Sequence, residues 1–346
     1  MNIIVLGAGA IGCYVGGRLA AAGEDITLVG RARTMEPIAL GGLTVTDLQG
    51  FKAHVAADLT AKHLRIASNL KLATQNLLRN QGPKAQATVV LLCVKGGATV
   101  SAAQEIVDCC PAGTSIVSLQ NGVDNVARIA SAAPQLRAFA GMVPYNVVMK
   151  TATHVHRTSM GKIYMEQSDV TAELVAILNA AGLLATTSND MRAVQWGKLL
   201  LNVNNPVNAL SDLPLREQLL NRDFRYVFAT LQQEALSAMH AAGIKPLQLT
   251  AVKPWILPHL LKLPDLLFTR VAKKMLVMDA NARSSMWDDI QHGRITEIED
   301  MCGAIVRLAK QVGTHAPCNA AMCKLMATHS KGHRFTGSEL RQALKI

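Results

Sequence analysis

The first half of the chain alternates short apolar runs with segments of helical periodicity, a pattern typical of a parallel sheet covered by helices. The runs that predict strands are residues 2–6, 25–29, 87–94 and 115–119. Residues 87–94 are almost continuously apolar, which is typical of a central strand buried on both faces. We therefore predict an α/β fold that begins with a Rossmann-type doubly wound sheet.

The pattern changes in the second half of the chain. Residues 139–165 contain three short segments that we interpret as antiparallel strands, and a helix over 172–181 and a last strand follow. After Asp190 only helical periodicity recurs, most clearly over 222–242 and 297–311. This change predicts two domains, 1–188 for the sheet and 189–346 for an all-helical C-terminal domain.

Two segments fit this scheme less well. Residues 56–87 are basic, and their leucines, among them Leu64 and Leu70, fit the apolar side of one amphipathic helix that ends at Gly82-Pro83. We interpret the charges of this segment as a solvated face and assign it no chemistry. The proline-rich residues 253–264 predict a connection between helices.

A glycine-rich loop follows the first predicted strand and opens a helix of small residues. It consists of Gly7, Ala8, Gly9, Ala10, Ile11 and Gly12. In this context Gly7 allows a tight turn, Gly9 lets the backbone approach a pyrophosphate at the helix N-terminus, and Gly12 lets the helix meet the strand. The loop therefore predicts a dinucleotide cofactor.

The residues after the second predicted strand indicate which dinucleotide is bound. An acidic residue there would bind the ribose hydroxyls of NAD, but the chain has Gly30, Arg31, Ala32 and Arg33. The Arg31 guanidinium, with Arg33 behind it, suits a 2′-phosphate, so we expect NADP(H). The alternative is a solvated basic turn.

Polar residues also follow the third and fourth predicted strands. Lys95 comes directly after the apolar run 87–94, and Asn121 follows 115–119. Because ligands of doubly wound folds bind at the carboxyl ends of the strands, we expect both side chains near the cofactor. A surface role for both is the alternative.

A lysine and two asparagines line up on the first predicted helix after the domain boundary. Lys198, Asn202 and Asn205 are spaced to share one stripe among leucines, and Pro206 should end the helix shortly afterwards. We expect the stripe to face a cleft between the domains, where the ammonium can donate a proton and the amides can orient a small ligand. Alternatively, the lysine reaches solvent and the asparagines cap the helix end.

Composition narrows the class of protein. The seven cysteines form no CxxC motif, which is typical of a reduced cytoplasmic protein without disulfides or zinc. No apolar run reaches the length of a membrane span, so we expect no membrane association. The net charge of +11 favours anionic partners, but the basic residues are dispersed and aromatic residues are only 4% of the chain. We therefore expect a small anionic ligand and not nucleic acid.

His154 and His156 would share one face of a strand, as metal ligands can. A third ligand of suitable spacing is missing nearby, so we expect no metal.

Glu297 follows Thr296, a candidate N-cap, so we expect its carboxylate in a first helical turn, where it is stabilised. Plain capping electrostatics is the alternative.

Taken together, these motifs resemble the ketopantoate reductase (2-dehydropantoate 2-reductase) family. The resemblance spans nearly the whole chain and rests on GAGAIG, Gly30-Arg31, Val94-Lys95-Gly96, Gln120-Asn121-Gly122, Trp196-Gly197-Lys198 with Asn202, Ser284-Ser285-Met286 and Thr296-Glu297-Ile298-Glu299. It implies an NADPH-dependent reduction of the 2-keto acid 2-dehydropantoate to (R)-pantoate, a step toward pantothenate and coenzyme A.

The resemblance also implies roles for single residues. Lys198 would be the general acid and Asn202 a substrate ligand. Ser285 would contact the substrate carboxylate, and Glu297 its primary hydroxyl. Lys95 and Asn121 would lie beside the nicotinamide and substrate. The same chemistry suits the residues themselves, because a ketone that accepts hydride becomes an alkoxide that an ammonium can protonate.

The chain departs from the family pattern in three places. The asparagine-proline pair falls closer to the lysine than usual, so either Asn204 or Asn205 is the counterpart of the family asparagine. An asparagine expected before Ser284 aligns with Ala282, next to Asn281, and residues 56–87 are longer than usual. Two other functions stay open: a related NADP-dependent 2-keto or 3-hydroxy acid dehydrogenase, and a non-catalytic NADP(H) sensor. The oligomeric state also stays open, with a homodimer as one option.

Overall fold

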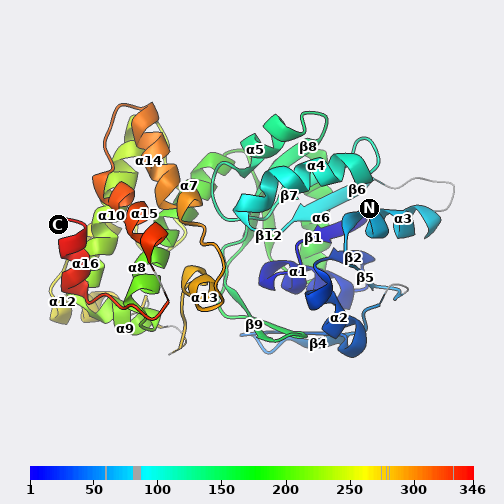
Figure 1. The fold of residues 1–346 in the computed structure, drawn as a ribbon, viewed down its shortest axis with the longest axis horizontal. Helices are drawn as coiled ribbons and strands as arrows, with labels where there is room; N and C mark the ends of the chain where they lie inside the picture. The colour runs from blue at the N-terminus through cyan, green and yellow to red at the C-terminus, as the bar shows by residue number, and fades with distance from the viewer. Residues whose placement is uncertain (59–60, 81–86, 274, 278, 280, 330) are drawn as a thin grey trace. The chain divides into compact units, whose positions relative to one another are not determined.

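The computed structural model describes residues 1–58, 61–80, 87–273, 275–277, 279, 281–329 and 331–346. The chain divides into two compact units, Met1–Met191 and Arg192–Ile346 (Figure 1). The border between them falls at the start of helix α7 (Met191–Asn202).

The first unit is built around an 8-stranded sheet with the order β12-β11-β8-β7-β6-β1-β2-β5. Its strands are β1 (Asn2–Leu6), β2 (Ile26–Val29), β5 (Leu64–Ala67), β6 (Thr88–Leu92), β7 (Ser115–Ser118), β8 (Arg137–Met142), β11 (Ile163–Glu166) and β12 (Ala185–Ser188). All neighbours from β5 to β8 run parallel, and β11 is antiparallel to β8 but parallel to β12. This arrangement confirms the predicted Rossmann-type sheet.

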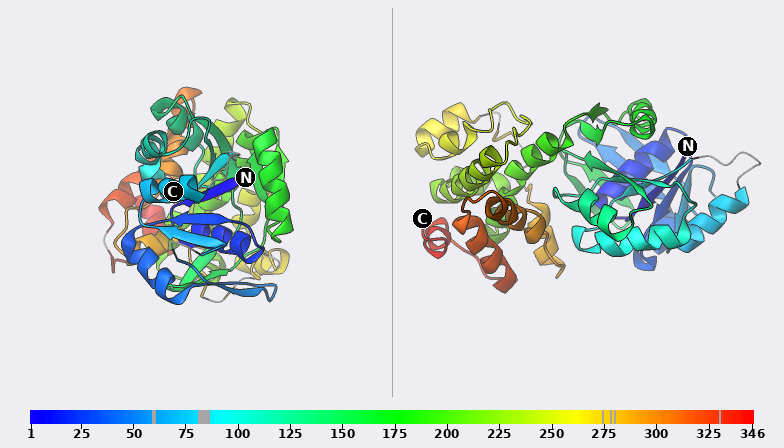
Figure 2. Two further views of the ribbon diagram at one scale, coloured as in Figure 1. Left: turned by 90° about the vertical axis from the view of Figure 1, so that its right-hand side faces the viewer. Right: turned by 90° about the horizontal axis from the view of Figure 1, so that it is seen from above.

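Helices cover both faces of this sheet (Figures 1 and 2). The first unit contains α1 (Ala10–Ala21), α2 (Ala32–Gly41), α3 (Leu70–Asn80), η1 (Gly96–Ala98), α4 (Thr99–Cys109), α5 (Asn125–Ala132) and α6 (Asp169–Ala180). Strand β1 shows why there are two cores, since successive side chains of a strand point to opposite faces. Val5 lies in the core with residues of α1 and α6, whereas Ile4 lies in the core with residues of α3, α4 and α5.

A second, 4-stranded sheet packs on α1, in the order β4-β3-β10-β9. Its strands are β3 (Leu43–Asp47), β4 (Lys52–Val55), β9 (Val147–Thr151) and β10 (His154–Arg157). His154 and His156 do share a face, where both rings hydrogen-bond to Thr46 Oγ1, at 2.8 and 2.7 Å. Among the residues that the structure describes, no three metal-ligating side chains cluster.

Residues 56–87 do not form the single helix that we expected. Leu64 begins strand β5, which pairs with β2 and forms an edge of the large sheet, and Leu70 begins the separate helix α3. The reason is that Leu64–Ala67 is only four residues long, so its apolar positions are compatible with a helix or a strand, and its pairing with β2 decides for the strand. Residues 59–60 and 81–86, including Gly82-Pro83, lie outside the described residues.

The second unit contains helices and loops but no strand among its described residues. It contains α7, α8 (Asn204–Ser211), α9 (Leu215–Leu220), α10 (Arg222–Ala241), α11 (Leu257–Leu261), α12 (Asp265–Val271), α13 (Ser285–Gln291), η2 (Ile298–Asp300), α14 (Cys302–Gln311), α15 (Pro317–Thr328) and α16 (Gly337–Ala343). Helix α10 packs against α11, α14 and α16. The predicted connection at 253–264 is therefore partly wrong, since α11 lies within it and begins with Pro258 in its first turn, where proline is tolerated.

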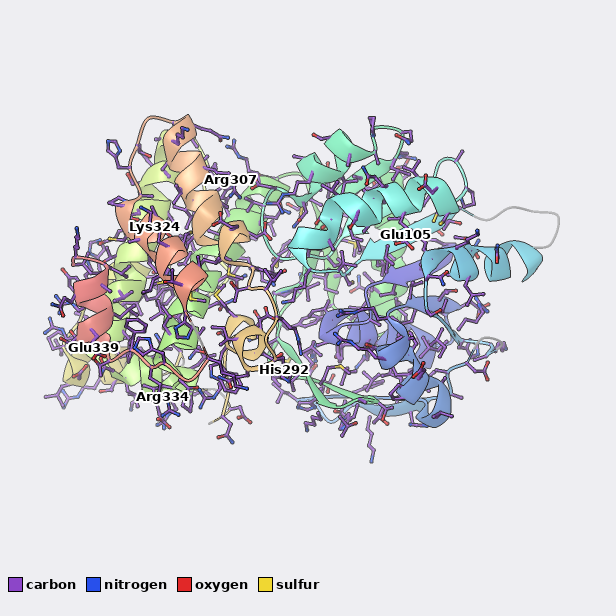
Figure 3. The ribbon with its side chains drawn as sticks, in the orientation of Figure 1. Glu105, His292, Arg307, Lys324, Arg334 and Glu339 are labelled. Atoms are coloured by element: carbon purple, nitrogen blue, oxygen red, sulfur yellow. The ribbon has the colours of Figure 1, made fainter. Side chains whose placement is uncertain are left out.

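Helix ends in this unit are fixed by local hydrogen bonds. At the start of α16, Glu339 (Figure 3) accepts hydrogen bonds from the Thr336 backbone N–H and hydroxyl, while the Thr336 hydroxyl accepts one from the Glu339 N–H. This is a capping box. No described helix of either unit is long and apolar enough to cross a membrane.

Candidate active site

The glycine-rich loop joins β1 to α1 at the carboxyl end of the sheet. At Gly7, which has φ +113°, an added Cβ would lie 2.6 Å from the Val94 backbone nitrogen, and at Gly12 it would collide with the Gly7 carbonyl oxygen. Gly9 is the N-cap of α1, is exposed, and has no atom within 4 Å of an added Cβ. The loop is therefore tight on its inner side and open at the helix N-terminus, where an anion is stabilised.

Arg31 lies beside this loop, at the end of β2. Gly30 precedes it, and an added Cβ there would lie 2.5 Å from the Ala8 Cβ, so the two loops touch through small residues. Arg31 has extended backbone at the N-cap position of α2 and is exposed, as is Arg33. An exposed guanidinium next to this glycine-rich loop is available to bind a phosphate.

Lys95 and Asn121 follow the neighbouring strands β6 and β7, as predicted. Lys95 is exposed and Asn121 is half-buried. Their loops are tied together by Gln120, whose Nε2 donates to the Val94 carbonyl at 3.0 Å and to Thr99 Oγ1 at 2.8 Å. Asn125 adds a bond from its Nδ2 to the Asn121 carbonyl at 2.7 Å. These hydrogen bonds hold both loops in fixed positions at the sheet edge.

Sequence reasoning missed the supporting roles of Gln120, Thr99 and Asn125. All three are polar yet buried, with at most 7% of their surface exposed. Buried polar side chains are generally hydrogen-bonded, so the burial of these three residues agrees with their role in holding the loops. For Gln120 the sequence signal is its place in a short polar run directly after an apolar strand.

The lysine helix in the second unit differs from the prediction. Helix α7 ends at Asn202, and Asn204 begins α8, which contains Pro206 near its start. Pro206 therefore does not end the lysine helix. It lies in the first turn of the next one, where its missing N–H has no helical partner to lose. Lys198 and Asn202 share a helix face, but Asn205 belongs to α8 and not to one continuous stripe.

Lys198 is coupled to a second charge within its unit. Burial lowers the pKa of its ammonium to about 8, and the Glu297 carboxylate opposes this effect by raising it. Glu297 is only 7% exposed. It does not lie in a first α-helical turn capped by Thr296, because the short η2 begins at Ile298 and α14 only at Cys302. Met301, with φ −112° and ψ −91°, separates the two.

The structure distinguishes the two asparagines that the sequence left open. Asn204 is 7% exposed, and it exchanges two amide hydrogen bonds with Gln218, at 3.0 and 2.9 Å. Asn205 is half-buried, and its Nδ2 has a weak contact of 3.8 Å with Met301 Sδ. Asn205 therefore has the amide with more capacity for a ligand.

The two serines near α13 differ in the same way. Ser284 is buried at the N-cap, where its hydroxyl accepts from the Trp287 N–H and donates to the Asn205 carbonyl, both at 3.1 Å. Its own N–H donates to Asn208 Oδ1 at 2.8 Å. Ser285 follows it in the first turn and is exposed. The network of Asn205, Asn208 and Ser284 thus fixes α8 against α13. Asn281, the neighbour of Ala282, is also exposed.

Comparison with known proteins gives the same family over both units. The ketopantoate reductase PanE/ApbA family model matches residues 3–169, and the model of the C-terminal part of that family matches residues 190–330. The 2-dehydropantoate 2-reductase of Pyrococcus horikoshii is 27% identical, over 94% of this chain and 96% of its own. That of Archaeoglobus fulgidus is 26% identical, over 94% and 96%.

Solved structures show the same similarity. The PanE/ApbA family ketopantoate reductase of Ralstonia eutropha JMP134 has a TM-score of 0.75 and 28% identity, covering 94% of this chain and 97% of its own. D-Mandelate dehydrogenase, solved with NADH and anilino(oxo)acetate, has a TM-score of 0.74 over 100% of both chains, but at 18% identity it shows a shared fold alone. With both units matched by its models, the chain belongs to the ketopantoate reductase PanE/ApbA family of oxidoreductases.

Proposed function

We propose that this protein reduces 2-dehydropantoate to (R)-pantoate with NADPH, a step toward pantothenate and coenzyme A. The observation that carries the proposal is the pair of Lys198 and Glu297 in the helical unit, a lysine whose pKa burial lowers to about 8 and a buried carboxylate that opposes this. A lysine whose pKa is lowered by burial and that lies near a buried carboxylate is typical of catalytic sites. The names of the relatives supply the substrate.

The residues of the first unit fit a dinucleotide with a 2′-phosphate. The loop Gly7–Gly12 would hold the pyrophosphate at the N-terminus of α1, with Gly9 as the point of closest approach. Arg31 would bind the 2′-phosphate, and Lys95 and Asn121 would lie near the nicotinamide. NADPH, when bound, supplies the hydride for the C2 ketone.

Lys198 would act as the general acid. Its ammonium would hydrogen-bond to the ketone oxygen and give it a proton as negative charge develops there. A pKa of about 8 suits this role, because the group is mostly protonated at neutral pH and yet gives up its proton more readily than an ordinary lysine.

The other residues of the helical unit would orient the substrate. Asn202 and Asn205 would bind its polar groups, and the exposed Ser285 hydroxyl would contact its carboxylate. Glu297 would accept a hydrogen bond from the primary hydroxyl. Such an acceptor favours substrates that carry the hydroxyl, because a substrate without it loses that hydrogen bond.

The test is NADPH oxidation by the purified protein with 2-dehydropantoate. Lys198→Ala should lower kcat by roughly 10²- to 10⁴-fold, the usual contribution of general acid catalysis, with little change in NADPH binding. Lys310→Ala, an exposed lysine on α14, is the matched control and should keep the wild-type kcat. If Lys198→Ala keeps near wild-type kcat, the donor is another group, and Lys95 is the first alternative.

The same assay separates the other functions. A broader 2-keto acid dehydrogenase would turn over 2-keto-3-methylbutanoate as well as 2-dehydropantoate. The shared fold with D-mandelate dehydrogenase makes phenylglyoxylate, the 2-keto acid that matches mandelate, a further substrate to compare. A cofactor sensor would bind NADPH but turn over none of these compounds.

A further inference from the structure

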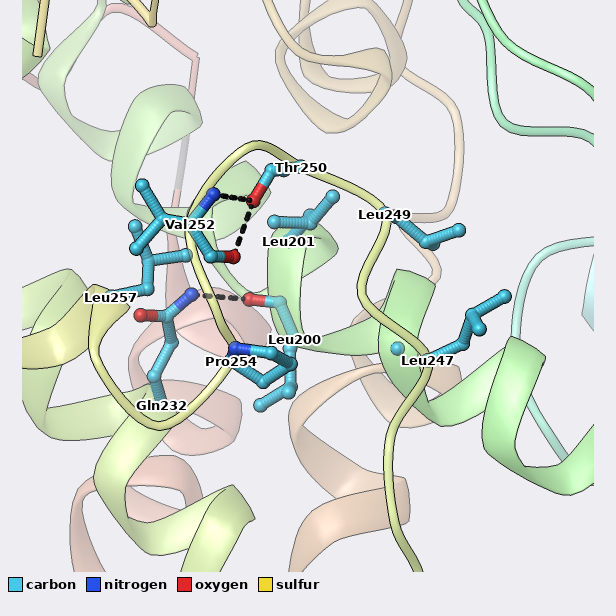
Figure 4. Close-up of a pocket in the computed structure, with 10 residues that line it drawn as sticks. Leu200, Leu201, Gln232, Leu247, Leu249, Thr250, Val252, Pro254 and Leu257 are labelled. Carbon is cyan, nitrogen blue, oxygen red and sulfur yellow. Dashed lines mark hydrogen bonds between the residues drawn. The ribbon is translucent and has the colours of Figure 1, made fainter.

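We propose that Gln232, on α10, is a positioning residue for Lys198, acting by holding the backbone of α7 through the Leu200 carbonyl. The inference rests on the proposed role of Lys198. Gln232 is 1% exposed, and its Nε2 donates to the Leu200 carbonyl at 2.8 Å (Figure 4).

The Leu200 carbonyl needs such a partner because α7 ends two residues later. The last carbonyls of a helix have no partner within it, and the final bond of this ladder runs from the Val203 N–H to the Leu199 carbonyl at 3.0 Å. Gln232 thus caps α7 from the side, just beyond Lys198. An isolated helix end would fray, and a buried amide donor prevents this.

A second contact holds α7 just before Lys198. The Leu247 N–H donates to the Ala193 carbonyl at 2.9 Å, and at Gly197 an added Cβ would lie 3.0 Å from the Leu247 nitrogen and still closer to its carbonyl oxygen. Only glycine lets this chain segment approach so closely. Lys198 therefore lies between two backbone anchors, Leu247 and Gln232.

Both anchors act on the same face of the helix. Gly197, Leu200 and Leu201 line a small apolar pocket that is closed by the chain from Leu247 to Leu257, and Gln232 forms part of its wall (Figure 4). Lys198 and Asn202 lie on the adjoining face, as their spacing requires. We therefore infer that Gln232 acts on Lys198 through the backbone of α7, which it holds at the Leu200 carbonyl.

The test compares Gln232→Met with Asn319→Leu. Asn319 is a matched control, because it is also buried and its Nδ2 donates to a carbonyl, that of Leu231 on α10, at 3.2 Å. Both variants should lose thermal stability. Only Gln232→Met should lose kcat, by roughly 10-fold or more, since displacements of about 1 Å can cost about 10²-fold. KM for NADPH should not change.

A second readout is the pKa of Lys198, measured by pH-dependent labelling with an amine reagent. Loosening of α7 should let water reach the ammonium, so this pKa should rise in Gln232→Met and stay unchanged in Asn319→Leu. If Gln232→Met does not fold, Gln232→Asn replaces it, because the shorter side chain keeps an amide at this position but cannot reach the Leu200 carbonyl.

A double-mutant cycle separates this inference from the proposed function. If Gln232 acts through Lys198, then Gln232→Met should lower kcat little further in the Lys198→Ala background. A full additional loss there, or an unchanged Lys198 pKa, would overturn the positioning role. A wild-type kcat for Lys198→Ala would instead overturn the proposed proton donor, while the labelling result still decides whether Gln232 positions the lysine.

Discussion

The sharpest prediction concerns how the activity depends on pH. Burial lowers the pKa of Lys198 to about 8. A proton donor must be protonated, so kcat/KM for 2-dehydropantoate should fall as pH rises through this value. The protonated fraction is ~90% at pH 7 and ~10% at pH 9, so kcat/KM should lose roughly tenfold per unit above pH 8. An unperturbed lysine would keep its activity to about pH 10.

Glu297 provides the perturbation that tests the cause. Its negative charge raises the pKa of Lys198 against the effect of burial. Glu297→Gln removes the charge but keeps the shape, so the pKa should fall further, by about 1 unit at the low end of the usual effect of a nearby opposite charge. The alkaline limb should therefore move to lower pH, and activity at neutral pH should decrease.

The assay is steady-state NADPH oxidation at saturating NADPH across about pH 6 to 10. Glu299→Gln is the matched control, since Glu299 is exposed and pairs with Arg307 at 3.7 Å. The control should leave the limb where it is. Two results would refute this account of Lys198 and Glu297. One is a wild-type kcat/KM that falls only near pH 10, and the other is a fall at the same pH in Glu297→Gln and in the wild type.

Three further variants test the cofactor, the substrate and the fold. Arg31→Ala should remove most of the preference for NADPH over NADH, because one charge-assisted contact contributes ~1.5 to 3 kcal/mol, or roughly 10- to 150-fold in Kd; equal Kd values in the wild type would contradict this. Glu297→Ala should lower kcat/KM for 2-dehydropantoate much more than for 2-keto-3-methylbutanoate, and equal losses would assign the carboxylate to the fold. Asp47→Ala should cost about 3 to 5 kcal/mol in a denaturant titration, because the buried Arg18 and Arg157 guanidiniums, at 3.2 and 3.0 Å, would lose their shared partner. An unchanged denaturation midpoint would show that Asp47 does not stabilise the two buried arginines.

The large sheet could be predicted because its signals are strong and local. Continuous apolar runs mark buried parallel strands, and the glycine loop fixes where the first one ends. The position of Lys95 and Asn121 at the sheet edge followed from the direction of the strands alone. Strand β5 was missed because four residues carry too little periodicity to distinguish a strand from a helix.

Helix boundaries near the candidate site were harder to predict. The sequence predicts that Pro206 ends the lysine helix. Proline is also common in the first turn of a helix, and the structure shows this second case, because the chain breaks at Val203 and a new helix begins at Asn204. Thr296 is a similar case. Its side chain suits an N-cap, but no helix begins directly after it, since η2 begins at Ile298 and α14 at Cys302. The Gln232 hydrogen bond has no sequence signal of its own, because its partner is a backbone carbonyl far along the chain.

The break between α7 and α8 explains how the helical unit can hold a lysine that is partly desolvated. A break in a buried helix leaves backbone groups without partners, and side-chain amides must supply them. Gln232 does so for the carbonyl of Leu200, which lies two residues before the end of α7. The buried Gln232 side chain is thus bound to the protein itself through its Nε2. With its end fixed in this way, α7 can hold Lys198 near the Glu297 carboxylate, and this opposite charge offsets part of the cost of burying the ammonium.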